Sequence, residues 1–217
     1  MITVGVDEAG RGSIIGPLTI AGVAVDEKDV KTLKNLGVKD SKLLSIKKIN
    51  ELEPKIKEVS KGYKVVALSP EEIDSRFDDE KNLNTMELDH MISIAKSLVG
   101  DKLIVDSPSA NTSKIKRYVE IQIRDKEVIA ANYADRDYIE VGAASILAKA
   151  EREREVSRIV KEIGYDFGSG YPSDPRTKEF LIKLRKEGLL EDEKLRKYIR
   201  KTWRTFKNIK NLTLDDF

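Results

Sequence analysis

Acidic residues stand directly after three apolar runs that have the character of β-strands. Asp7 and Glu8 end the first run, which alternates and is rich in β-branched residues. Asp106 ends a second run, and Asp135 follows a third. Ligands of α/β sheets bind beyond the ends of the strands, so these carboxylates can converge on one crevice. Asp also favours turns, which gives each acid taken alone a plain structural explanation.

A cluster of four carboxylates repels itself unless a cation lies among them. An all-oxygen site suits Mg²⁺ or Mn²⁺. The chain contains no Cys and a single His, His90, which excludes disulfides and Cys-ligated zinc and argues against a histidine-based triad. Catalysis by this chain therefore has to use carboxylates, Lys, hydroxyls or a hard metal ion.

The order of the expected elements determines the fold class. Apolar runs predict strands over residues 2–7, 17–25, 64–68, 103–106 and 127–131. Helical spacing and capping residues predict helices over 46–59, from 70, over 84–99, from 113, and over 138–163, 177–188 and 194–208. This order predicts an α/β fold with a mixed sheet that helices cover on both faces.

Charge is unevenly distributed along the 217 residues. The segment from Arg176 to Lys210 contains 13 Lys and Arg against 5 Asp and Glu, although the net charge of the chain is only +2. This pattern indicates either a polyanion partner held beside carboxylates or a solvated helical appendage. The longest uncharged stretch, Gly12 to Val25, is too short to span a bilayer, and we expect a cytoplasmic protein without a membrane partner.

Five blocks in the chain carry a family resemblance. In order, they are Asp7-Glu-Ala-Gly-Arg-Gly12 with Gly16-Pro17, Lys39-Asp-Ser-Lys42, Asn82-Leu-Asn84, Ala143-Ala-Ser-Ile-Leu-Ala-Lys149 and Gly168-Ser-Gly-Tyr-Pro-Ser-Asp174. Together they resemble the type 2 ribonucleases H, most closely archaeal ribonucleases HII, from Ile2 to about Trp203. The resemblance implies an RNase H-like fold with a C-terminal helical extension.

The resemblance also implies an activity and a metal site. The activity is endonucleolytic cleavage of the RNA strand of RNA–DNA hybrids, and of duplex DNA on the 5′ side of embedded ribonucleotides, by metal-activated water. Its implied cofactor is Mg²⁺ or Mn²⁺, with two ions in the site. The family's metal-binding acids fall on Asp7, Glu8, Asp106 and Asp135. Asp135 is preferred to Asp137 because its spacing from the Ala143 block matches the family.

Further positions match substrate-binding residues of the family. Gly10-Arg11-Gly12 matches the element that contacts 2′-hydroxyls, where residues without side chains let the backbone approach closely. Tyr171 matches the tyrosine that packs on the sugar at the RNA-to-DNA junction. Lys42 and Lys149 match basic residues near backbone phosphates. The corresponding plain explanations are a turn, a surface anchor and two solvated lysines.

Two residues depart from the family pattern. Ser13 stands where many members have Pro, which should alter loop stiffness. Thr202 stands where a His is frequent, which puts a proton-transfer or phosphate role there in doubt.

Two other classes of function fit the same acids. A junction resolvase or an exonuclease of the same fold would share the strand-end acids, and a nucleic-acid-binding protein would use them to hold a structural ion.

The resemblance implies three parts: a catalytic domain over 1–172, a basic helical extension over 173–210 and a tail over 211–217. The tail resembles a sliding-clamp-binding motif, with Asn211 in place of Gln, Leu214 and Phe217 at the aliphatic and first aromatic positions, and no second aromatic residue. The alternative is a terminus that folds back or frays. The expected partners are RNA–DNA hybrids, ribonucleotide-containing duplex DNA and the clamp, and the expected state is a monomer.

Overall fold

A computed structural model describes residues 1–38, 44–76 and 81–211 of the chain. The chain forms two compact units that are interleaved along the sequence. Unit 1 comprises Met1–Ala9, Thr19–Val66 and Lys81–Glu151, and unit 2 comprises Gly10–Leu18, Ala67–Glu80 and Arg152–Phe217. The division expected at residue 172 stays a prediction, because compactness does not measure independent folding.

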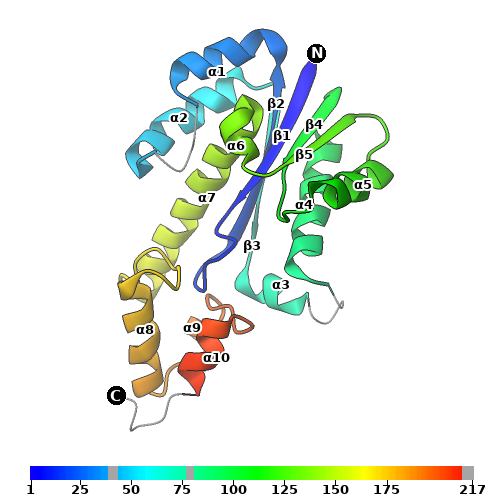
Figure 1. Cartoon of the computed structure of the whole chain (residues 1–217). Helices are drawn as coiled ribbons and strands as arrows, with labels where there is room; N and C mark the ends of the chain where they lie inside the picture. The colour runs from blue at the N-terminus through cyan, green and yellow to red at the C-terminus, as the bar shows by residue number, and fades with distance from the viewer. Residues whose placement is uncertain (39–43, 77–80, 212–217) are drawn as a thin grey trace. The chain divides into compact units, whose positions relative to one another are not determined.

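The centre of unit 1 is a mixed five-stranded sheet in the order β3-β2-β1-β4-β5 (Figure 1). Its strands are β1 (Ile2–Ala9), β2 (Leu18–Asp26), β3 (Gly62–Leu68), β4 (Lys102–Asp106) and β5 (Glu127–Ala131). β1 pairs antiparallel with β2 and parallel with β4, and β4 pairs parallel with β5. The predicted mixed sheet is therefore confirmed, and β1 runs two residues beyond its predicted end.

Helices cover both faces of this sheet, as the sequence predicted. The helices of unit 1 are η1 (Glu27–Asp29), α1 (Val30–Leu36), α2 (Ile46–Val59), α4 (Leu83–Ser97), α5 (Thr112–Gln122), α6 (Ala134–Asp137) and the first half of α7 (Ile139–Ile163), which continues into unit 2 from Arg152. Figure 1 shows α1, α2 and α7 on one side and α4 and α5 on the other. The sequence predictions missed η1, α1 and α6.

Two glycines in neighbouring strands allow these helices to approach closely. A side chain on Gly5 would collide with the backbone of Glu140 and Val141 at the start of α7. A side chain on Gly22 would lie 2.5 Å from Ile94 of α4. Because the two glycines face opposite sides of the pleated sheet, each face has one point of close helix packing.

The core on the α7 side packs the helices of that face against the sheet. It contains buried aliphatic and alanine side chains of β1, β2, α1, α2 and the first half of α7. Burial of this apolar surface is the main favourable term for folding.

No helix in the described part of the chain is long and apolar enough to cross a bilayer.

Unit 2 has its own core and contains α3 (Pro70–Ser75), α8 (Pro175–Lys186), α9 (Glu193–Arg196) and α10 (Arg204–Lys210). The predicted single helix over 194–208 is wrong, because α9 ends at Arg196 and α10 begins only at Arg204. Between them, Ile199 forms an isolated antiparallel bridge with Ile15. This pairing requires extended backbone and therefore interrupts the helix.

Candidate active site

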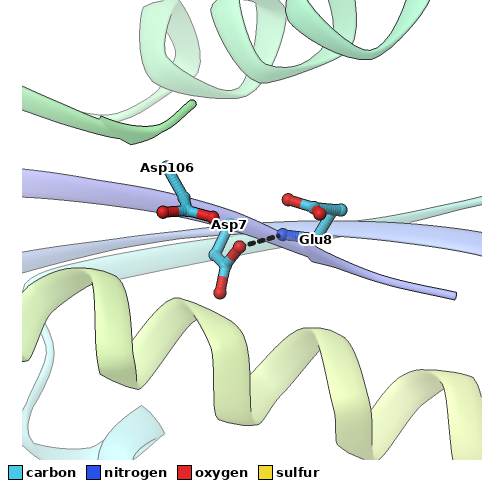
Figure 2. Close-up of side chains that lie close together, drawn as sticks. All are labelled: Asp7, Glu8 and Asp106. Atoms are coloured by element: carbon cyan, nitrogen blue, oxygen red, sulfur yellow. Dashed lines mark hydrogen bonds between the residues drawn. The ribbon is translucent and has the colours of Figure 1, made fainter. Parts of the chain in front are cut away.

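Three carboxylates come together in unit 1 at the ends of β1 and β4. Asp7, Glu8 and Asp106 each offer an oxygen, and these atoms all lie within 4.8 Å of one another. Figure 2 shows the three side chains lying together. Two of them come from β1 and one from β4. The convergence that the sequence predicted for strand-end acids is therefore present for these three residues.

The pairing of β1 explains how neighbouring residues reach one place. Its parallel ladder with β4 ends at Val6, opposite Val105. Its antiparallel ladder with β2 continues through Asp7 and Glu8 to Ala9. The strand therefore continues past Glu8 and ends at Ala9. Successive side chains of a strand point to opposite faces of the sheet, so alternation alone would separate Asp7 from Glu8. Beyond Val6, β4 no longer pairs with the edge of β1, and we attribute the meeting of Asp7 and Glu8 to this open edge.

Asp7 is the most deeply buried member of this cluster, with 4% of its surface exposed. Burial raises the pKa of Asp7 well above its usual value, and the nearby charges of Glu8 and Asp106 raise it further. A hydrogen bond with the Ser145 side chain lowers this pKa. The backbone N–H of Glu8 also donates to Asp7 Oδ1 over 2.7 Å (Figure 2).

The donor set fits a hard divalent cation. Asp7 is buried, Glu8 and Asp106 are half-buried, and all three offer oxygen. Crowded carboxylates out of water repel one another, and a cation among them offsets both the repulsion and the loss of hydration. Oxygen-only ligands suit Mg²⁺ and Mn²⁺ rather than softer metals.

Ser145 is a residue whose contact with Asp7 the sequence analysis missed. It lies on α7 and is 1% exposed, between alanines and aliphatic residues that pack on the sheet. A buried hydroxyl in such an apolar helix face needs a hydrogen-bond partner. That requirement was the available signal, but the sequence alone did not identify Asp7 as the partner.

Asp106 is fixed by the start of α6. The backbone N–H of Ala134 donates to Asp106 Oδ1 over 2.6 Å. Tyr133, just before Ala134, has a backbone φ of 58°, which residues other than glycine rarely adopt. Strained backbone of this kind persists only where the surrounding structure holds it.

The structure does not bring Asp135 into the same group. It is 4% exposed and directly follows Ala134, but it is not among the described acids whose oxygens all lie within 4.8 Å of one another. Asp137, the other possible register, is exposed. Burial distinguishes the two acids, and the assignment of Asp135 as the fourth ligand stays a prediction.

The predicted ribose-reading loop and Tyr171 lie side by side in unit 2. A side chain on Gly12 would lie 3.8 Å from the Tyr171 ring. The N–H groups of Ile14 and Ile15 both donate to Gly170 O, over 2.8 and 3.1 Å. These bonds join the segment after Gly12 to the segment before Tyr171, so the two elements form one substructure.

Two arginines that the sequence analysis did not single out support this substructure. The Arg152 guanidinium lies 4.7 Å from the centre of the Tyr171 ring and donates to Ser169 O over 2.6 Å. Arg200 bonds the backbone of the segment around Gly12. Both arginines are buried, at 3% and 0% exposure, which is rare for an arginine and marks them as structural anchors.

The structure describes only one of the two predicted phosphate-binding lysines. Lys149 is half-buried on α7, one turn beyond Ser145. Lys42 lies outside the described residues. The roles of both stay predictions.

Comparison with known proteins gives one consistent family. The family model for ribonuclease HII matches residues 4–206. The chain is 41% identical to the ribonuclease HII of Methanococcus maripaludis over 96% of this chain and 87% of that protein. It is also 41% identical to the ribonuclease HII of Archaeoglobus fulgidus, over 98% of each chain.

Solved structures agree in fold. The crystal structure of ribonuclease H2 from Pyrococcus horikoshii has a TM-score of 0.87 at 36% identity and covers 97% of each chain. The chain in the complex of PCNA with RNase HII from Archaeoglobus fulgidus also has a TM-score of 0.87, at 40% identity, over 99% of this chain and 100% of that one. A ribonuclease HIII in complex with Mn²⁺ has the same fold, with a TM-score of 0.79 at 21% identity.

Proposed function

Because the chain belongs to the ribonuclease HII family and is therefore a ribonuclease H, we propose that it cuts the RNA strand of RNA–DNA hybrids and cuts duplex DNA on the 5′ side of embedded ribonucleotides. The products are a 3′-hydroxyl and a 5′-phosphate. The observation that supports the chemistry most directly is the cluster of Asp7, Glu8 and Asp106, with mutual oxygen separations within 4.8 Å.

We assign metal binding to Asp7, Glu8, Asp106 and Asp135, and Mg²⁺ or Mn²⁺ as the ions, two in the complete site. The family depends on divalent metals, and a bound divalent ion supplies an acidified water and stabilises the charge that develops on the phosphate oxygens. Hydrogen bonds within the protein hold two of these carboxylates in position. Asp7 is held by Ser145 and by the Glu8 N–H, and Asp106 by the Ala134 N–H.

We assign ribose recognition to Gly10-Arg11-Gly12 and Tyr171. Gly10 follows Glu8 by two positions, so the chain leads directly from the acidic cluster into the loop. A loop with little side-chain bulk lets backbone groups reach a 2′-hydroxyl, which is the group that distinguishes RNA from DNA. The Arg152 guanidinium lies against the Tyr171 ring. Lys42, Lys149 and the basic segment 176–210 are assigned to backbone phosphates.

We further propose a monomeric cytoplasmic enzyme of DNA replication and repair that binds a sliding clamp through residues 211–217. The chain in the solved complex with PCNA is 40% identical to this one. In this chain, Leu214 and Phe217 carry the hydrophobic part of the motif and lie outside the described residues. Deleting 211–217 should leave cleavage of short duplexes unchanged and remove clamp binding in a calorimetric titration. Clamp binding by the truncated protein would place the contact elsewhere.

The decisive experiment uses one substrate and its controls. A duplex carrying a single ribonucleotide should be cut with Mg²⁺ and should stay intact with EDTA, and the all-DNA duplex should stay intact in both. Asp106→Asn should stop cleavage, because a neutral amide is a poorer ligand for a hard cation. A chain that instead cut four-way junctions, or degraded DNA from its ends, would be a resolvase or an exonuclease of the same fold.

A further inference from the structure

Arg200 is a fully buried arginine whose guanidinium bonds one loop in unit 2. Its Nη2 donates to Gly10 O over 2.8 Å and to Gly16 O over 3.1 Å. Its Nη1 donates to Arg11 O over 2.9 Å, and its Nε to Gly16 O over 3.2 Å. Burial lowers the pKa of Arg200 to about 9, so the group is still charged at neutral pH. A buried charge is tolerated only when it is hydrogen-bonded, and here carbonyl groups supply all of these bonds.

The bonds to Gly10 O and Arg11 O have a geometric consequence for the next residues. A peptide unit is planar and trans, so its carbonyl and the following N–H point in opposite directions. Fixing Gly10 O therefore fixes the direction of the Arg11 N–H, and fixing Arg11 O fixes that of the Gly12 N–H. These N–H groups belong to the loop assigned to ribose recognition. Arg200 controls their direction from the side opposite to them.

Ser13 adds to the same anchor. Its backbone N–H donates to Gly10 O over 3.2 Å, and its hydroxyl donates to the same oxygen over 2.8 Å. Gly10 has a φ of 83°, a conformation that only glycine adopts without strain. The serine that departs from the family pattern therefore contributes a bond that a proline, which has no N–H and no hydroxyl, would lack.

The residues that follow Arg200 form hydrogen bonds with α3. The backbone N–H of Lys201 donates to Asp74 Oδ2 over 2.7 Å, and the Thr202 hydroxyl donates to Asp74 Oδ1. The Arg200 guanidinium also lies 4.8 Å from the centre of the Trp203 ring. Thr202, where the family often has His, thus has a structural contact in this chain. The contact holds the backbone next to Arg200 in place.

We propose that Arg200 is a positioning residue for ribonucleotide recognition, which aims the Arg11 and Gly12 N–H groups by holding the carbonyls before them. The inference rests on the proposed function, which assigns this loop to the 2′-hydroxyl. It gives the basic C-terminal segment a second task besides phosphate contact. Removing Arg200 should therefore reduce the preference for a ribonucleotide more than the affinity for duplex DNA.

Three variants separate geometry from charge. Arg200→Lys keeps the charge, but a single ammonium cannot reproduce the fork that reaches three carbonyls. Arg200→Met removes both charge and fork. Arg204→Met is the matched control, because Arg204 is an exposed arginine of the same basic segment.

Binding is measured by fluorescence anisotropy with Ca²⁺ in place of Mg²⁺, on an all-DNA duplex and on the same duplex with one ribonucleotide. Arg200→Met should reduce the ratio of the two affinities about tenfold, and Arg200→Lys should reduce it by several-fold. Arg204→Met should weaken both complexes by the same factor and leave the ratio unchanged, because phosphate contacts carry no information about the ribose.

Hydrogen exchange supplies a readout that does not depend on substrate. Arg200→Met should speed exchange of the Arg11 and Gly12 amides at least tenfold relative to amides of α2, which belongs to unit 1. Should Arg200→Met fail to fold, Arg200→Lys and Thr202→Val decide, and Thr202→Val should lower the affinity ratio two- to threefold by loosening the contact with Asp74.

The outcomes distinguish this inference from the proposed function. A wild-type chain that bound both duplexes equally would overturn ribonucleotide recognition by this loop, and the inference with it. A wild-type chain that discriminated, while folded Arg200 variants discriminated equally well, would overturn only the role of Arg200. Loss of affinity for both duplexes in equal measure would show that Arg200 supports the structure of this unit in general, and it would also overturn the inference.

Discussion

Replacing Asp7 with Asn is expected to stabilise the metal-free protein and to abolish turnover. Asn has nearly the shape of Asp, and its Oδ1 can still accept the hydrogen bond from the Glu8 N–H. The variant removes a buried charge that lies near the oxygens of Glu8 and Asp106. It therefore tests whether the cluster is held together against its own repulsion.

The magnitude follows from the separations. At an effective dielectric constant of about 20, two unit charges 4.8 Å apart repel by about 3.5 kcal/mol. Asp7 has two such neighbours, but its raised pKa means that protonation already relieves part of the repulsion. We expect a net gain of about 1–3 kcal/mol in the free energy of unfolding, or about 2–10 °C in Tm for a chain of this size.

Thermal unfolding in EDTA and in saturating Mg²⁺ measures both effects. Asp7→Asn should raise Tm in EDTA and should gain less from Mg²⁺ than the wild type does. Asp137→Asn, which removes an exposed acid of the same unit, is the control and should change Tm little. A lower Tm for Asp7→Asn in EDTA would refute the repulsion argument. Near-native turnover at saturating Mg²⁺ would refute the metal assignment.

The sign of the pH dependence provides a further check on Asp7. Its pKa is raised in the folded protein, so the folded state binds the proton more tightly than the unfolded state. Stability of the metal-free wild type should therefore fall as pH rises above the ordinary value of 3.8. Asp7→Asn should lack this part of the slope, and an unchanged slope would assign it to other groups.

Asp135→Asn should reduce turnover more than Asp137→Asn, because only Asp135 is buried next to the start of α6; the reverse order in a cleavage assay would shift the register by two residues. Tyr171→Ala should lose more turnover on a single embedded ribonucleotide than on a long hybrid, since one ribose offers fewer 2′-hydroxyl contacts. Equal losses would make Tyr171 a packing residue. Hydrogen bonds from Ser169 lower the pKa of Asp174 to about 2. The stability they add is present above the ordinary pKa of 3.8 and is lost as pH falls toward 2, so urea unfolding of Asp174→Asn and the wild type should converge there.

Local signals predicted the elements that depend on local physics. Helix α2 begins after Ser45 and ends at Val59, as predicted, because its apolar residues recur at helical spacing and Ser45 caps its first turn. Helix α3 begins at Pro70 behind a complete capping box. Helix α1 was missed, although Gly37 ends it in the left-handed conformation that typically closes a helix.

The acidic cluster was predictable only in part. Parallel strands place their carboxyl ends at one edge of a sheet, so the meeting of Asp7 with Asp106 followed from the sequence once β1 and β4 were recognised. The position of Glu8 did not follow, because it depends on where the β4 ladder stops relative to β1. The contact with Ser145 depends on the packing of α7 against the sheet, which no local pattern encodes.

The predicted helix over 194–208 failed for a reason that bears on function. Its residues have helical spacing and good helix propensity, yet the chain leaves the helix after Arg196. The non-helical stretch contains Ile199, which pairs with Ile15, and Arg200, which enters the interior to bond Gly10, Arg11 and Gly16. Local propensity is overridden where tertiary contacts are worth more, and natural chains concentrate such conflicts at functional or strained sites. The break in the helix is thus an independent reason to assign Arg200 a task that a plain basic appendage would not require.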